Sequence, residues 1–175
     1  MTQTQTQAPT PKPTETRPPL ERIRRPQIVE SQRRDPEKIA LGDTVTIEDG
    51  PELHQHLASK VPGQTNGVGT AIHPGTTVAL GLAIDAAILS LNGKQLGISM
   101  LRYCTFSMEK RVSTERSMRA TARVAELGAR HVECVSEVFQ DGHLMCRARI
   151  GLCRARDGKA APLSSYHLLD DTGDG

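Results

Sequence analysis

Apolar residues are densest at positions 76–91. Only Asp85 is charged in this stretch, and apolar residues fall on nearly every side of a helix drawn through it. A helix of this kind must be surrounded by protein, because no face of it suits water. Thr76 or Thr77 can cap its first turn, and Gly93 suits the left-handed position after its end. We therefore predict a buried helix over 76–91, which is shorter than a membrane-spanning helix needs to be.

Alternation of apolar and polar residues begins after this helix. Extended segments are predicted at 97–106, 118–125, 132–139 and 144–152, with one earlier strand at 41–47. Asp141-Gly142 would form the last hairpin turn. The residues expected to face the core are Met118, Ala120, Ala122, Val124, Leu144, Cys146, Ala148, Ile150 and Leu152; those expected to face solvent are Arg119, Thr121, Arg123, Met145, Arg147 and Arg149. This pattern indicates a sheet with one buried face, which would curl around the single helix.

The predicted domain covers residues 39–156. Residues 1–38 begin with low complexity and are rich in proline and arginine, so we expect a disordered tail. This tail is either a solvated leader or a basic arm that touches a partner or nucleic acid. Within and around the domain, the remaining expectations are short helices at 22–34 and 51–60, a long loop at 61–74 and a loose C-terminal tail at 157–175.

Composition and charge narrow the function classes. The net charge is +2 with both signs interspersed, and the chain has two Tyr, two Phe and no Trp. Neither a basic surface nor aromatic stacking therefore favours nucleic-acid binding by the domain. The four cysteines form no Cys-x-x-Cys pair and no zinc-ligand spacing. We expect reduced structural cysteines, no metal, no cofactor, no signal peptide and a cytoplasmic location.

Residues 126–152 resemble a known layout. They combine a glycine between strands, an alternating strand, the Asp-Gly turn and a final alternating strand. This arrangement is similar to the hotdog superfamily, and in particular to its acyl thioesterases of the phenylacetate-pathway type. The helix with Asp85 and the residues 97–112 fit the same pattern. The resemblance implies an α+β hotdog fold, an antiparallel sheet wrapped around one long central helix.

The start of the helix departs from two enzyme types of this fold. The thioesterases usually carry His-Gly-Gly there, whereas this chain has His73-Pro74-Gly75, displaced toward the N-terminus relative to Asp85. Hydroxyacyl-thioester dehydratases carry Pro-Gly at this point, as Pro74-Gly75 does. However, Leu80 stands where their glutamate is expected, and Thr65 stands where their histidine is expected.

Asp85 and His73 are the candidate catalytic residues. An ionised carboxylate in an apolar helix is costly unless it is paired or faces a cavity. The resemblance implies that Asp85 is a general base or nucleophile toward a thioester carbonyl; otherwise it is hydrogen-bonded at a subunit contact. His73 would orient a water or polarise the carbonyl, or it is an ordinary loop histidine.

Further candidates would bind the substrate. The backbone N–H groups of Gly75, Thr76 and Thr77 are suited to hold an oxyanion, although Thr76 or Thr77 also suits a capping role alone. Asn66 either contacts substrate from the long loop or forms a turn with Gly67. The outward arginines Arg119, Arg123, Arg147 and Arg149 would bind the phosphates of coenzyme A or an acidic carrier protein, or they form a solvated sheet face.

Three functions remain open at this stage. The first is hydrolysis of an acyl-CoA or acyl-carrier-protein thioester, with coenzyme A or phosphopantetheine present only as part of the substrate. The second is dehydration of a hydroxyacyl thioester, and the third is a non-catalytic hotdog protein that binds an acyl ligand. Because the sheet would have an exposed edge, and because the resembling proteins pair their sheets with the site between subunits, we expect a homodimer or tetramer.

Overall fold

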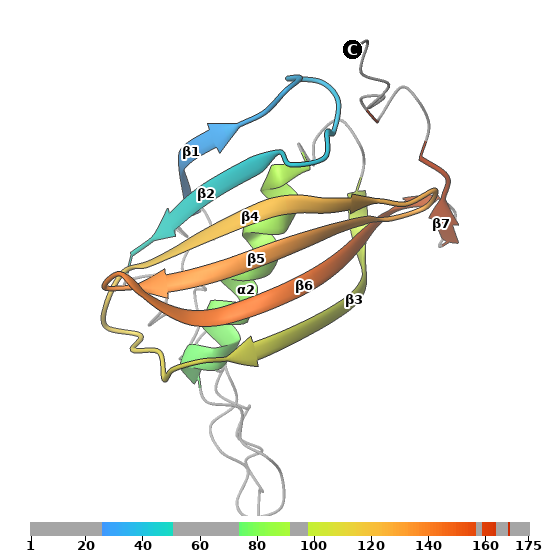
Figure 1. Ribbon diagram of the computed structural model, residues 1–175. Coiled ribbons are helices and arrows are strands. Elements are labelled where there is room, and N and C mark those ends of the chain that lie inside the picture. The colour runs from blue at the N-terminus through green and yellow to red at the C-terminus, as the bar shows by residue number, and fades with distance from the viewer. Residues whose placement is uncertain (1–25, 51–73, 92–97, 157–158, 164–167, 169–175) are drawn as a thin grey trace, which may run out of the picture.

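The computed structural model describes residues 26–50, 74–91, 98–156, 159–163 and 168, and its elements form one sheet and one helix (Figure 1). The elements are β1 Gln27–Gln32, β2 Thr44–Asp49, α2 Pro74–Ser90, β3 Ile98–Met108, β4 Met118–Leu127, β5 Val132–Gln140, β6 His143–Arg156 and β7 Lys159–Ala161. The strands follow the order β1-β2-β4-β5-β6-β3, with β7 beside β6, and all strand pairs are antiparallel. The sheet curves around α2, as the sequence predicted (Figure 1).

The alternating segments form the strands expected of them, with small shifts at their ends. In β4, all four residues predicted to face the core are buried, which confirms the inward side of this strand. Asp141 and Gly142 both have positive φ, 52° and 76°, as the predicted two-residue hairpin turn requires. The period of two therefore located the centre of the sheet correctly.

Met145 is an exception to this alternation. It was predicted to face solvent, but only 7% of it is exposed. The pairing of β5 with β6 shifts its register between Val138 and Phe139. In addition, the backbone N–H groups of Glu109 and Lys110 both donate to the Met145 carbonyl, which places the loop after β3 against this residue. A register shift and a covering loop depend on tertiary structure and leave no mark in the alternation.

The N-terminal and C-terminal segments contribute more to the sheet than predicted. The helix expected at 22–34 is wrong over Gln27–Gln32, because these residues form β1 along the edge of β2. Unpaired N–H and C=O groups on that edge favour an added strand over an isolated helix. At the other end, β7 pairs with β6, and Leu168 forms a parallel bridge with Ile39. Both segments fall in stretches that were expected to be tails.

Helix α2 packs against the sheet through small residues. Ala79, Ala83, Ala86 and Ala87 are fully buried, so the helix backbone comes close to the strands. Ser136 of β5 donates a hydrogen bond to the Ala83 carbonyl at 2.9 Å. This contact satisfies a buried hydroxyl that would otherwise cost roughly 1–3 kcal/mol.

The prediction of a helix surrounded on every side is wrong for the side of α2 that faces away from the sheet. Thr77 and Asp85 are exposed, and Leu80, Ile84 and Ile88 are only half-buried. A single sheet contacts one side of a helix, so the apolar residues on the far side remain partly open in this chain. The predicted helix at 51–60 and most of the predicted loop at 61–74 lie outside the described residues.

Candidate functional site

Asp85 lies on the side of α2 that faces away from the sheet. The residue is exposed on the surface of the chain, between the half-buried Ile84 and Ala86, which is buried. Even so, the protein atoms packed around the carboxyl raise its pKa above the usual value, and the nearby charge of Asp49 raises it further. An aspartate with a raised pKa in a water-accessible position can accept a proton from a bound water.

Asp49 is a second carboxylate whose charge acts on Asp85. It is the last residue of β2, opposite Met118 of β4, and only 6% of it is exposed. Val45 and Ile47 precede it at a spacing of two, and both are fully buried, so Asp49 lies on the helix-facing side of the strand. The sequence analysis did not single out Asp49, although this alternation was the signal that could have found it.

The first turn of α2 contains Gly75, Thr76 and Thr77, the residues that the sequence analysis proposed as oxyanion donors. Gly75 is buried, Thr76 is half-buried and Thr77 is exposed, and the turn contains no acidic residue. Backbone N–H groups at the start of a helix lack intrahelical partners and lie at the positive end of its dipole. Eight residues separate Thr77 from Asp85, which is ~12 Å along a helix. Within a single chain, one thioester carbonyl therefore cannot contact both the Thr77 N–H and the Asp85 carboxylate.

The four candidate arginines lie on the opposite face of the sheet from α2. Arg119 is paired with Glu48 at 2.9 Å and Arg147 with Glu137 at 3.0 Å, while Arg149 forms two hydrogen bonds to Glu133. Arg123 has no ion pair among the residues that the structure describes. The structure thus does not bring these arginines together with Asp85, because the sheet stands between them.

A polar network on this outer face was not predicted. Tyr103 of β3 donates a hydrogen bond to Glu133 of β5 at 2.6 Å, and the other carboxylate oxygen of Glu133 accepts from Arg149 of β6. Arg149 and then Tyr103 lower the pKa of Glu133, whereas Glu133 raises the pKa of Tyr103. The tyrosine ring crosses over Gly151, where a side chain would overlap it. The three residues come from three strands, so no local pattern in the sequence joins them.

Several expected site features remain outside this geometry. His73 and Asn66 lie outside the described residues. Over the parts of the chain that are described, no cluster of His, Cys, Asp and Glu could hold a metal ion, and no helix has the length and apolarity to cross a membrane. None of the four cysteines forms a disulfide, and burial raises the pKa of Cys134 and of Cys146 to about 11. Such thiols are poor nucleophiles at neutral pH.

Comparison with known proteins decides the fold. No family model and no curated protein matches the chain. Among solved structures, the TT0310 protein from Thermus thermophilus has a TM-score of 0.51 at 16% identity, and the match covers 79% of this chain and 99% of that protein. The chain has the hotdog fold.

Two other solved structures are similar at lower scores. A mutant of the phenylacetic acid degradation protein PaaI from Thermus thermophilus is 17% identical, with a TM-score of 0.49 over 74% of this hotdog chain and 93% of that one. A thioesterase from the same organism, complexed with coenzyme A and zinc, is 16% identical, with a TM-score of 0.44 over 51% and 71% of the two chains. At these identities the likeness concerns the fold alone.

Proposed function

We propose that this hotdog protein hydrolyses an acyl thioester of coenzyme A or of a carrier-protein phosphopantetheine, with Asp85 as general base or nucleophile. The observation that carries the proposal is the position of Asp85: a carboxylate on the open side of an apolar helix, with a raised pKa and a second carboxylate near by. A structural aspartate would instead be expected to end in a saturated set of hydrogen bonds, as Asp43 does with the backbone N–H groups of Arg34 and Ala40.

The proposed reaction uses two ends of the helix surface. Asp85 takes a proton from water as the water attacks the thioester carbonyl, or it attacks the carbonyl directly and water then hydrolyses the resulting acyl anhydride, which frees the acid and the carboxylate. The N–H groups of Thr76 and Thr77 hold the oxygen as it becomes negative, and the leaving thiolate departs with the carrier. His73, as the sequence suggested, would assist from the segment before the helix.

The separation of Asp85 from the first turn calls for a second copy of the chain. Two helices side by side in opposite directions bring Asp85 of one close to Thr77 of the other, which shortens the distance that a single helix imposes. We therefore propose a homodimer with two equivalent sites, each built from both subunits. Closed two-fold pairs of this kind are the commonest oligomers.

Strand β3 is the edge that we propose for this pairing. It is eleven residues long, and among the described strands it pairs with β6 alone. Phe106 is 44% exposed and lies opposite Ala148, which is buried on the helix side of β6, and Leu101 is 45% exposed. Large apolar side chains on the open edge of a sheet favour pairing with another strand. A pair of β3 strands would cover both side chains and bring the two helices together.

Thioester hydrolysis tests the function directly. Purified protein is mixed with acyl-CoAs of several chain lengths and types, and release of free thiol is measured with a thiol reagent. Asp85→Asn keeps the shape of the side chain and removes its basicity, so we expect turnover to fall by at least ~10²-fold. Glu137→Gln makes the same chemical change on the outer face of the sheet and should leave turnover unchanged.

The same panel separates the alternatives. New absorbance of a conjugated double bond from hydroxyacyl-CoA would identify a dehydratase, and binding without turnover would identify an acyl-binding protein. Either result would show that the proposed thioester hydrolysis is wrong. Full turnover in Asp85→Asn would remove Asp85 from the mechanism.

A further inference from the structure

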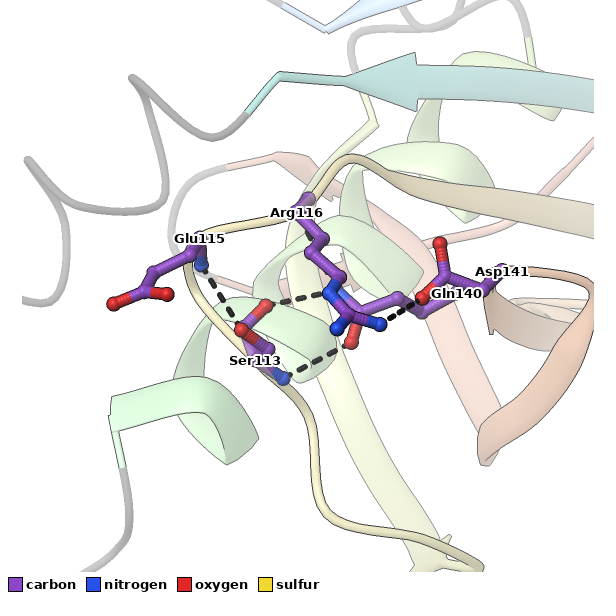
Figure 2. Close-up of polar contacts among 5 residues, drawn as sticks. All are labelled: Ser113, Glu115, Arg116, Gln140 and Asp141. Carbon is purple, nitrogen blue, oxygen red and sulfur yellow. Dashed lines mark hydrogen bonds and ion pairs between the residues drawn. The ribbon is translucent and has the colours of Figure 1, made fainter.

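Gln140 anchors the loop between β3 and β4 through the backbone of that loop. It is the last residue of β5, and only 3% of it is exposed. Its Oε1 accepts the Ser113 N–H at 3.0 Å, and its Nε2 donates to the carbonyls of Ser113 and Arg116 at 2.8 and 3.3 Å. Figure 2 shows the two contacts between Ser113 and the Gln140 amide. The side chain thus pairs with Ser113 much as a neighbouring strand would.

Only an amide can make this set of contacts. A carboxylate has no donor for the two carbonyls, and an alanine would leave three backbone groups of the loop without these partners. The other links are weaker or local. Arg116 and Asp141 form an ion pair at 2.5 Å in which both side chains are more than half exposed, and Glu115 N–H donates to the Ser113 hydroxyl. Exposed ion pairs contribute little to stability. The Glu109 and Lys110 N–H groups hold the start of the loop to the Met145 carbonyl, and Gln140 is the main polar anchor of the later part, residues 113–116.

The anchored loop lies at the level of the first turn of α2. Ser136 contacts the Ala83 carbonyl, and Cys134 lies by the Ala87 carbonyl, so β5 and α2 run in opposite directions. From Ser136 to Gln140 the strand advances about 13 Å, which equals roughly nine helical residues. Counted back from Ala83, this level is the start of the helix. Val112, in the same loop, is buried in the core cluster that includes Val78.

The geometry points to Gln140 as a positioning residue that fixes the segment Ser113–Thr114 as a wall of the site at the start of α2. This inference rests on the proposed thioester hydrolysis, because the first turn of α2 is where the oxyanion would be held. Gln140 acts through the backbone of the loop and does not touch the substrate. Since the wall borders the reacting carbonyl, it affects the chemical step more than the binding of the carrier.

The test compares Gln140→Ala and Gln140→Glu with Asp141→Asn. The third variant is a matched control: it removes the ion pair with Arg116, and asparagine tolerates the positive φ of position 141. We expect faster hydrogen exchange at the Ser113 amide in Gln140→Ala, which removes the acceptor of that N–H. In both Gln140 variants we expect a fall in kcat on the order of 10- to 100-fold and a KM within about twofold. The control should match the wild type. Thermal unfolding of each variant verifies that the domain is folded.

The outcomes are distinct. Faster exchange with unchanged kcat would overturn the role of Gln140 while the hydrolase stands. A wild type without turnover would overturn the proposed function instead. In that case a non-hydrolysable acyl-CoA thioether serves as the probe. Protection of the Ser113 amide by this probe in the wild type, lost in Gln140→Ala, would support the wall, and absence of protection would overturn it.

Discussion

Asp85 is open to solvent on the surface of the chain, and its carboxyl nevertheless holds a proton more tightly than an ordinary aspartic acid. Surrounding protein atoms are the larger cause, and the charge of Asp49 is the smaller. The base form of Asp85 exists above its pKa, so a reaction that needs this form gains rate as the pH rises through that pKa. The acid limb of the pH–kcat profile should therefore lie above the usual aspartate value of 3.8.

Asp49→Asn should move this limb toward lower pH. The substitution removes a like charge, while the burial that contributes most to the raised pKa of Asp85 remains, so the return to the usual value is partial. The measurement is kcat over a pH series for both proteins. A merely structural effect would lower kcat at every pH and leave the limb in place. A limb that stays fixed would show that Asp49 does not act on the base.

At the scale of single residues, the sequence identifies Asp85 but not its surroundings. One charge in an apolar helix is visible without a structure. Asp49 was also visible in principle, as the third residue of an alternating inward series. Gln140 and Tyr103 were not, because their partners lie 24 or more positions away in the chain. Their roles follow from pairings between strands, which a local pattern does not encode.

Among the elements, β3 is tied to the sheet by the network of Tyr103, Glu133 and Arg149. The Tyr103 ring passes over Gly151, so Gly151→Ala would push the ring aside and break its hydrogen bond to Glu133. We expect Gly151→Ala to lower the free energy of unfolding by about 1–3 kcal/mol. Urea denaturation monitored by circular dichroism measures this change.

The Tyr103→Ala variant tests whether the ring causes the loss of stability in Gly151→Ala. In a Tyr103→Ala protein the ring is absent, so adding Gly151→Ala should cost almost nothing further. The difference between the two backgrounds is the coupling energy of the pair. Equal costs in both backgrounds would mean that the added methyl group strains the β6 backbone, and the proposed contact with the ring would be wrong.

The sequence predicts most elements and misses those with tertiary causes. Periods of two and the continuous apolar run locate β4, β5, β6 and α2, because each has one face or side in the core. Strand β1 has no such signal, since all six of its residues are exposed. It exists because β2 offers an open edge. The apolar run also could not reveal that, among the described residues, the strands cover one side of the helix and leave Asp85 exposed on the other.

For the whole molecule, the proposed dimer makes a direct prediction. Phe106→Asp places a charge on the helix side of the open β3 edge, where pairing would bury it, so the variant should be monomeric and inactive. Ile28→Asp is the matched control, because Ile28 is 52% exposed on the opposite edge strand, β1. Size-exclusion chromatography with light scattering measures the mass of each protein in solution.

Retention of the dimer in Phe106→Asp, with loss of it in Ile28→Asp, would move the interface to β1. A wild type that remains monomeric at high concentration would remove the shared site altogether. The distance between Thr77 and Asp85 would then need another explanation.

The bridge between Leu168 and Ile39 and the pairing of β2 with β4 join residues that are synthesised far apart in time, so they limit how early these contacts can form. Strand β2 pairs with β4, so β2 waits for more than sixty later residues to be synthesised before it gains that partner. Ile39 waits longer still, until Leu168 has left the exit tunnel. A nascent chain therefore leaves one edge of β2 unpaired until β4 has been synthesised, and an unpaired strand edge of this kind is prone to aggregate.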